Sequence, residues 1–325
     1  MKKSIIAMAV AGALAVPAIA SADATLYGSF RMNLEKQTKP STSANLNNNA
    51  SRIGIRGTVD LGMENTVGIY NWETTLNVND DGNGIGDIRY ASMGATGDWG
   101  TALLGRLDHF TWNFAGGTTD LFQSGSGSIL SVDYVGEGVD RLDRRTNNTL
   151  AYVSPDMNGL TLGAGVVMQG DAIEKDNEVD GYNLGAQYQL DGLSLGLGYG
   201  AVKTAKAGGT YLVDENIWSV AASYEIDNFT LAAAYEESRN KVPTRNIRDR
   251  GYSLAGNYEV DGLGGSLAYS TVKQNLDGAQ RGKRVQAEIY NRMGNGMVSA
   301  GYIDNNKHAR GGNSNTFYLG YRLDF

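Results

Sequence analysis

The side chains best suited to nucleophilic or acid–base chemistry are scarce in this chain of 325 residues. It has no cysteine and only two histidines, His109 and His308. A hydrolase needs a histidine beside a nucleophile or an activated water, and no G-x-S-x-G segment lies near either histidine. Both histidines fall in connecting segments, where we expect them to be solvated. The sequence therefore predicts no catalytic residue.

Metal-binding patterns are equally weak. The absence of cysteine excludes thiolate ligands. The segment from Asn79 to Asp87, NDDGNGIGD, is rich in oxygen ligands but lacks the spacing and the distal glutamate of an EF-hand loop. We predict a flexible acidic loop at this position, with no metal site and no cofactor.

Charged side chains point to another kind of chemistry, the guidance of ions by electric fields. Residues 107–146 form a long stretch without regular periodicity that contains the acidic residues Asp120, Asp133, Glu137 and Asp140. Connections longer than about 12–15 residues are uncommon inside a compact domain and are usually functional. The alternative is a surface loop with scattered acidic residues.

Four arginines alternate with apolar residues elsewhere in the chain. Arg52 and Arg56 lie on the face opposite a row of isoleucine, valine and leucine in residues 51–61, and Arg31 and Arg89 alternate with aromatic neighbours in the same way. Alternation places successive side chains on opposite faces of a strand. These arginines are therefore expected to share a polar surface, where acidic neighbours could also neutralise them.

The elements that would position these residues have a period of two almost throughout. Residues 181–190 alternate apolar with polar or glycine positions, and after Asp191-Gly192 the pattern resumes, which is a strong hairpin signal. Seven tight turns alternate with eight longer connections, which predicts sixteen strands. The longer connections are expected near residues 36–50, 78–86, 107–146, 170–179, 203–214, 239–249, 274–281 and 305–313.

An even number of strands with tight turns at one end and long loops at the other is typical of an outer-membrane barrel. The predicted fold is all-β, a closed antiparallel transmembrane barrel of sixteen strands. A soluble sandwich, propeller or solenoid is the alternative. The repeated apolar rows favour the barrel, and so do the aromatic residues near strand ends, such as Tyr27, Trp72 and Tyr258, which we expect to form a girdle at the membrane interface. An arginine facing lipid near the bilayer midplane would cost about 2–4 kcal/mol, so the four arginines should face the lumen.

The N-terminal residues have the pattern of an export signal. Lys2 and Lys3 precede an apolar run from Ile5 to Ile19, and Ala20-Ser21-Ala22 has the small residues of a cleavage site. The alternative is a membrane anchor, but the run is shorter than the ~20 residues that a spanning helix needs. We predict a cleaved signal peptide over residues 1–22 and a barrel domain over residues 23–325. The net charge of −7 argues against nucleic acid as a partner.

Four segments resemble the general porins of Gram-negative outer membranes. They are TLYGSFR at 25–31, SRIGIRG at 51–57, the block from Arg89 to Arg106, and the stretch from Arg145 to Pro155. The resemblance covers essentially the whole chain after the signal peptide. It implies a homotrimer of sixteen-stranded barrels in the outer membrane, surrounded by lipid and lipopolysaccharide, through which ions and small hydrophilic solutes diffuse. An outer-membrane barrel hydrolase and a non-conducting structural or adhesion barrel remain the alternatives.

The resemblance also implies a role for the long acidic segment. In porins the third extracellular loop folds into the lumen, so the acidic residues of 107–146 would face the wall arginines across a constriction. Many enterobacterial general porins have a lysine at the position of Ser29, whereas this chain has Arg31 two residues later. The exact basic cluster is therefore expected to differ from that of those porins.

The last segment, FYLGYRLDF, ends in a row of alternating apolar residues that includes Tyr321, Leu323 and Phe325. In a closed barrel the last strand must pair with the first so that neither edge is left open. The resemblance implies that the barrel-assembly machinery recognises this terminal aromatic strand. The alternative is that Phe325 is simply a lipid-facing residue.

Overall fold

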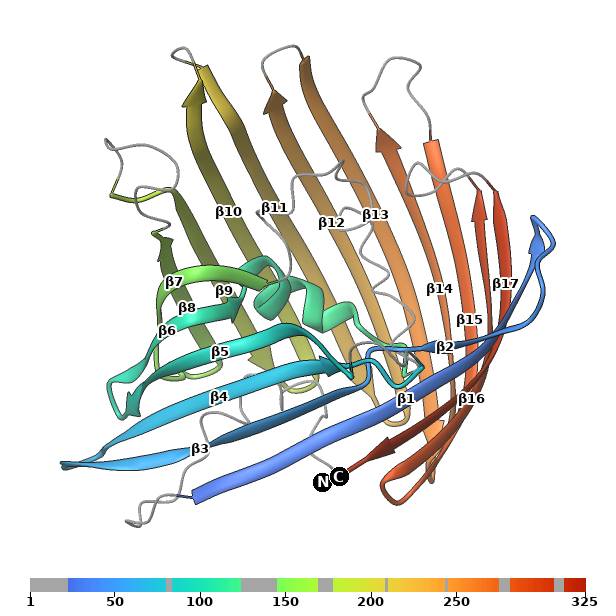
Figure 1. Ribbon diagram of the computed structural model, residues 1–325, viewed down its shortest axis with the longest axis horizontal. Helices are drawn as coiled ribbons and strands as arrows, with labels where there is room; N and C mark the ends of the chain where they lie inside the picture. Colours follow the sequence, from blue (N-terminus) through green and yellow to red (C-terminus); the bar gives the residue numbers. More distant parts are fainter. Residues whose placement is uncertain are drawn as a thin grey trace.

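The computed structural model describes residues 23–79, 84–123, 145–168, 178–207, 210–242, 245–274, 281–306 and 313–325. Sixteen long strands form one closed antiparallel sheet, which confirms the predicted barrel (Figure 1). A seventeenth, short strand, β2, lies in the first long connection and pairs with β1. The strands are β1 (Asp23–Lys39), β2 (Asn45–Asn48), β3 (Arg52–Met63), β4 (Thr66–Leu76), β5 (Ile85–Gly97), β6 (Gly100–Asp108), β7 (Arg145–Val153), β8 (Leu160–Val167), β9 (Gly181–Leu190), β10 (Leu193–Ala207), β11 (Thr210–Ile226), β12 (Phe229–Val242), β13 (Arg245–Val260), β14 (Leu263–Gln274), β15 (Arg281–Met293), β16 (Gly296–Asn306) and β17 (Ser314–Asp324).

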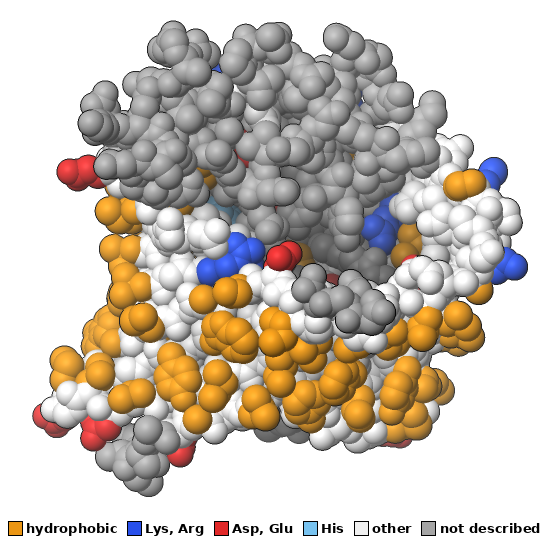
Figure 2. Space-filling view, viewed as in Figure 1, with side chains coloured by type: hydrophobic (Ala, Val, Ile, Leu, Met, Phe, Trp, Pro, Cys, Tyr) orange, Lys and Arg blue, Asp and Glu red, His pale blue; other side chains and the backbone are white. Residues whose placement is uncertain are grey.

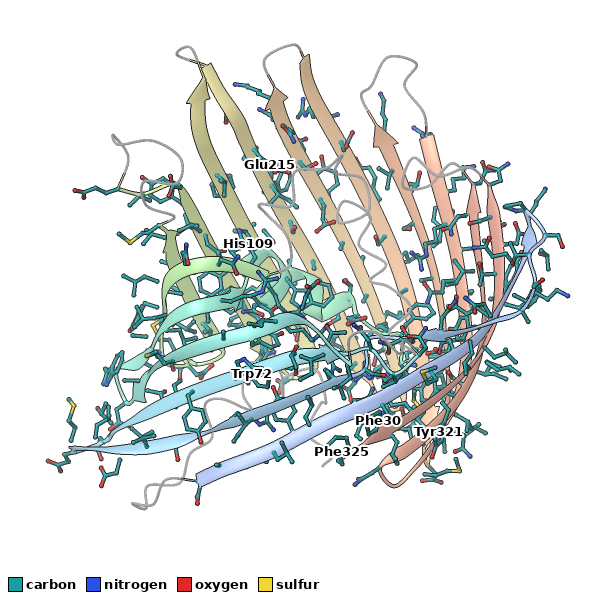
Figure 3. The ribbon with its side chains drawn as sticks, viewed as in Figure 1. Phe30, Trp72, His109, Glu215, Tyr321 and Phe325 are labelled. Carbon is teal, nitrogen blue, oxygen red and sulfur yellow. The ribbon has the colours of Figure 1, made fainter. Side chains whose placement is uncertain are left out.

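The sheet closes where β17 pairs with β1. Phe325, one residue beyond β17, exchanges two backbone hydrogen bonds with Gly28, at 2.9 and 3.1 Å. Its ring lies 5.6 Å from the ring of Phe30, centroid to centroid (Figure 3). The C-terminal residue is thus part of the seam that removes the last open edge of the sheet.

The outer surface carries a band of apolar side chains (Figure 2). Leu231, Leu254 and Leu267, on three neighbouring strands, are 57%, 60% and 61% exposed, whereas the alternate residues Ala232 and Ala255 are buried. Residues directly opposite on neighbouring strands share a face, so the band continues from strand to strand. The prediction that Tyr27 belongs to an outer aromatic girdle is wrong, because its hydroxyl donates to Asn71 on the inner face.

The short connections between strands follow their turn residues. Asp191, Asp227 and Asp261 begin two-residue turns with φ of 45°, 52° and 49°. Two-residue hairpin turns require this left-handed conformation, which aspartate tolerates better than most residues.

Two of the predicted longer connections are mostly strand. β10 and β11 are separated only by residues 208–209, and β12 and β13 only by residues 243–244. Polar residues on both faces of these segments resemble a loop in sequence, yet antiparallel pairing continues without needing an apolar face. Among the described residues, no helix is long and apolar enough to cross a membrane.

The described part of the connection after β6 enters the barrel. It contains two short helical turns, η2 (Thr111–Ala115) and η3 (Gly116–Thr119), drawn inside the ring of strands in Figure 1. The structure therefore confirms that the long third loop folds into the lumen.

Candidate functional site

The inward loop is held on a strip of the inner wall that lacks side chains. Glycines at lumen-facing positions of β8, β9 and β10 lie directly under it, and a Cβ at Gly185 or Gly198 would overlap Phe114 or the backbone of Thr111. Phe110 and Phe114 stack with their ring centroids 5.2 Å apart in this space. Glycine is needed here because another backbone approaches closely.

His109 anchors the beginning of the loop. It is 1% exposed and packs against Gly200, while its Nδ1 lies 2.7 Å from the hydroxyl of Thr111. Burial lowers the pKa of His109 to about 4, because removal from water disfavours the charged imidazolium. The expectation that this histidine is a solvated loop residue is wrong. His308 lies outside the described residues.

The rest of the described loop follows the wall across further strands. Ala115 packs with Ala221 and Ala234, and Leu121 and Phe122 pack with a row of alanines on β12, β13 and β14. The hydroxyl of Ser266 donates to the carbonyl of Leu121 at 2.9 Å. The backbone N–H of Gln123 then donates to Glu288 on β15 at 2.7 Å. The described part of the loop therefore runs along the inner wall from β6 to β15.

Arginines from β1, β3 and β17 gather on the opposite part of the wall. Arg31 is buried, and its Nε donates to the hydroxyl of Ser29 at 2.8 Å. Its partner across the seam is Arg322, and Arg52 lies opposite Ser29 on the other side of β1. These three arginines are close enough for their charges to interact. Arg322 is paired with Asp324 at 2.7 Å.

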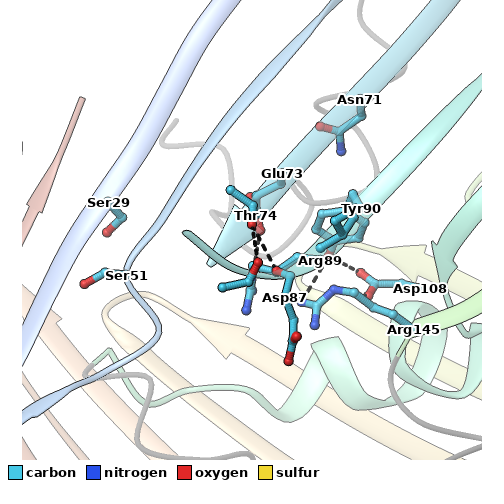
Figure 4. A network of polar contacts seen from close by, with 12 residues as sticks. Ser29, Ser51, Asn71, Glu73, Thr74, Asp87, Arg89, Tyr90, Asp108 and Arg145 are labelled. Atoms are coloured by element: carbon cyan, nitrogen blue, oxygen red, sulfur yellow. Dashed lines mark hydrogen bonds and ion pairs between the residues drawn. The ribbon is translucent and has the colours of Figure 1, made fainter. Parts of the chain in front are cut away.

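Arg89 joins this group through an ion pair with Glu73 on β4 (Figure 4). A β-bulge in this stretch pairs Tyr90 with Glu73 and places Tyr90 on the inner face as well. The prediction that Tyr90 points away from Arg89 is therefore wrong, because a bulge adds a residue and breaks strict alternation.

A second polar cluster lies beside the first, at the end of β6 and the start of β7, between which the inward loop is inserted. Tyr90 donates its hydroxyl proton to Asp108 at 2.6 Å, and Arg145 lies over the Tyr90 ring at 4.7 Å and 3.4 Å from Asp108 (Figure 4). Arg145 and Asp108 are also directly opposite each other on β7 and β6. These contacts fasten both ends of the loop, because Asp108 precedes it and Arg145 follows it.

The fourth predicted arginine lies at another level of the barrel. Arg56 is exposed and sits 4.9 Å from the centroid of the Tyr27 ring. It is four residues from Arg52 on the same strand, which corresponds to about 13 Å at ~3.3 Å per residue. The structure thus brings Arg31, Arg52 and Arg89 together but leaves Arg56 apart.

Of the predicted acidic residues of the loop, Asp120 follows η3 on the inward segment and is half-buried. Asp133, Glu137 and Asp140 lie outside the described residues. In the part of the chain that is described, no three acidic or histidine side chains are grouped so that they could hold a metal ion.

Sequence reasoning missed Arg322 and Arg145 as members of the basic wall. Arg322 joins Arg31 only through the pairing of the last strand with the first, and no local pattern reveals that register. The glycines under the inward loop, in contrast, can be recognised in the sequence. Gly196, Gly198 and Gly200 occupy three successive positions on one face of the strand, so this part of the face lacks side chains and needs something else to cover it.

Comparisons with known proteins agree with this architecture. A family model described as Gram-negative porin matches residues 7–324. Outer membrane porin protein 32 of Delftia acidovorans is 28% identical over 281 residues, which cover 81% of this chain and 78% of that protein. Porin-like protein L of Photobacterium profundum is 28% identical over 286 residues, covering 79% and 78%.

Solved structures share the fold. An anion-selective porin from Comamonas acidovorans superposes with a TM-score of 0.80 at 20% identity, covering 94% of this chain and all of that one. Salmonella typhi OmpF superposes with a TM-score of 0.74 at 20% identity, covering 93% and 97%. Since the family model spans nearly all of the sequence, the chain belongs to the Gram-negative porin family and forms a diffusion channel in the outer membrane.

Proposed function

We propose that passage through this channel is limited where the inward loop faces the arginines of β1, β3, β5 and β17. The observation that carries the proposal is the convergence of Arg31, Arg52, Arg89 and Arg322 on one part of the wall, while the loop is held against the part from β8 to β15. The solutes are ions and small hydrophilic molecules, which a polar lumen can accommodate.

The charges of this zone support weak rather than strict selectivity. Arg89 and Arg322 are paired with Glu73 and Asp324, whereas in the part of the chain that is described Arg52 has no carboxylate within ion-pair distance. The basic wall would face Asp120, which follows η3 on the inward loop. Opposed rows of charge create a transverse field that orients polar solutes and excludes neither sign of ion.

Planar-bilayer recording and liposome swelling of the purified protein test the proposal. We expect a stable ionic current and swelling with small neutral sugars but not with larger ones. Absence of current from correctly folded protein would instead support a non-conducting structural barrel. Hydrolytic activity lost on replacement of His109 would support the enzyme alternative, which the burial of His109 disfavours.

We further propose that the protein assembles as a homotrimer, embedded in lipid and lipopolysaccharide after recognition by the barrel-assembly machinery. A Vibrio cholerae outer-membrane protein of the same fold, OmpT, has been solved in a trimer form. Residues 1–22 would be removed on export, so mass spectrometry of the isolated protein should give an N-terminus at Asp23. Slow migration on mildly denaturing gels that collapses on heating would support the trimer.

A further inference from the structure

The outer face of the barrel carries a group of arginines that the channel does not use. On β12 and β13, outward-facing residues alternate with buried ones. Leu231 on β12 and Tyr252 on β13 face outward and are 57% and 56% exposed. Glu237, Arg239, Arg248 and Arg250 have the same parity as these residues, and no register shift interrupts the pairing. They therefore lie on the outer surface, not in the lumen.

One carboxylate organises three guanidinium groups at this place. Glu237 Oε2 accepts from Arg248 at 2.7 Å and from Arg250 at 3.0 Å, and Oε1 lies 3.1 Å from Arg239. The carboxylate is 3% exposed, but the arginine side chains are 47%, 38% and 39% exposed for Arg239, Arg248 and Arg250. Each arginine has five N–H donors, so most of them remain available to a ligand.

Lys273 extends this group, because it is directly opposite Arg250 on β14 and exposed. We call Arg239, Arg248, Arg250 and Lys273 the basic ledge. With Glu237 it has four basic groups and one acidic group. The inner face of the same strands is acidic instead, with Glu236 and Asp249 buried there. The excess of positive charge on the outer side is therefore local, in a chain whose net charge is −7.

The position of the ledge relative to the membrane is marked by aromatic residues. Tyr235 and Tyr252 are directly opposite each other, one outward-facing position closer to the apolar band than Glu237 and Arg250. Trp218 is directly opposite Glu237, and the rings of Trp218 and Tyr252 each lie 4.8 Å from that of Tyr235, centroid to centroid. Tyrosine and tryptophan collect at the level of the lipid headgroups. The tight turn at residues 227–228 joins the other ends of β11 and β12, so the ledge is at the extracellular end, upper in Figure 1.

We propose that the basic ledge binds the phosphate groups of lipopolysaccharide in the outer leaflet. Guanidinium groups bind phosphate in a bidentate manner, and Glu237 holds three of them in place before the lipid arrives. The inference rests on the proposed contact with lipopolysaccharide and on the outer-membrane orientation, but not on the constriction or its selectivity.

The experiment measures binding of lipid A carrying its phosphates, in mixed micelles, to the detergent-purified porin. The test variant is Arg248→Gln/Arg250→Gln, and the matched control is Arg52→Gln/Arg89→Gln, which removes the same charge from the lumen. We expect the ledge variant to bind at least about tenfold more weakly, since charge-assisted hydrogen bonds are lost. The lumenal variant should bind as the wild type does, while only the lumenal variant changes the current.

Equal binding by the wild type and the ledge variant would overturn the proposal. So would equal binding of wild-type protein to lipid A and to its dephosphorylated form, a comparison that requires no variant to fold. Competition by inorganic phosphate at the same strength would mean a free-phosphate site and not a lipid site. Loss of the gel-stable oligomer with unchanged lipid binding would assign the ledge to a contact between copies.

If the glutamine variant does not assemble, Arg248→Lys/Arg250→Lys keeps the charge and removes the fork geometry. We expect intermediate binding from it, and binding equal to wild type would overturn the role of the guanidinium groups. A porin that conducts normally but ignores lipid phosphate would refute this inference alone. A porin that binds the lipid but carries no current would refute the proposed function alone.

Discussion

At the scale of single residues, the position of the inward loop depends on glycines in the barrel wall. The glycines of β8, β9 and β10 leave room for the inward loop, and Phe110 and Phe114 fill that room. Addition of a side chain there acts on the loop and not on the strand pairing, because the space is on the lumenal side. These glycines therefore determine where the inward loop lies in the pore.

Replacing Gly198 by valine should displace the loop from the wall. The new Cβ would meet the backbone of Thr111, which cannot move aside as a flexible side chain can, and overpacking of this kind costs about 1–3 kcal/mol. We expect altered single-channel conductance and faster proteolysis within residues 109–123. Gly84→Val is the control, since a Cβ at Gly84 meets nothing within 4 Å. Wild-type conductance and proteolysis in the Gly198 variant would contradict this account of loop docking.

His109 should make docking of the loop sensitive to acid. Its pKa is about 4 when docked and near the ordinary 6.5 when released. Docking is therefore strongest above pH 6.5, where His109 is neutral in both states, and weakens as the pH falls from about 6.5 to about 4. The full effect is about 3 kcal/mol.

Hydrogen exchange of the amides in residues 109–123, measured at pH values across this window, checks the expectation after correction for the intrinsic rate. Protection should fall with pH in the wild type and stay level in His109→Gln, whose side chain does not titrate. An identical pH dependence in both proteins would show that another group controls docking.

At the scale of elements, alternation of residue types predicted the strands and their turns well. It failed where the backbone departs from strict pairing. The bulge in β5 turns Tyr90 inward beside Arg89, and nothing in the local composition marks the extra residue. The polar ends of β10–β13 were predicted as loops because backbone pairing, which extends these strands, is independent of side-chain polarity.

The terminal strand is an element whose last residue should matter for assembly. Phe325 bonds to Gly28 through its backbone and contacts Phe30 through its ring, whereas Arg322 forms an ion pair with Asp324 on its own strand. We expect Phe325→Asp to lower the yield of heat-modifiable barrel more than Arg322→Asp does. Equal yields of the two variants in outer-membrane fractions would argue against a special role of the terminal aromatic residue.

At the scale of the whole molecule, closure and the inward loop bring together residues from distant parts of the chain. Arg31, Arg52 and Arg89 could be predicted as lumenal from parity and from the cost of placing arginine in lipid. Their grouping with Arg322 could not, because it depends on the register across the seam. The ion pairs of Arg89 and Arg145 likewise depend on neighbours that only the closed sheet supplies.

The arginine wall should set the sign of the channel's weak ion selectivity, although the chain as a whole is acidic. Distant charges are screened beyond about 8 Å at physiological salt, so the charges of the narrow zone dominate. Replacing two of the wall arginines by neutral residues should make the pore more favourable to permeating cations. Arg56→Gln is a suitable control, because Arg56 lies at a different level.

The most direct test is the zero-current potential of single channels in a salt gradient, for the wild type and for Arg52→Gln/Arg89→Gln. We predict that the double variant shifts the potential towards cation preference, while Arg56→Gln shifts it much less. A double variant that folds, conducts and keeps the wild-type potential would show that these arginines do not line the constriction.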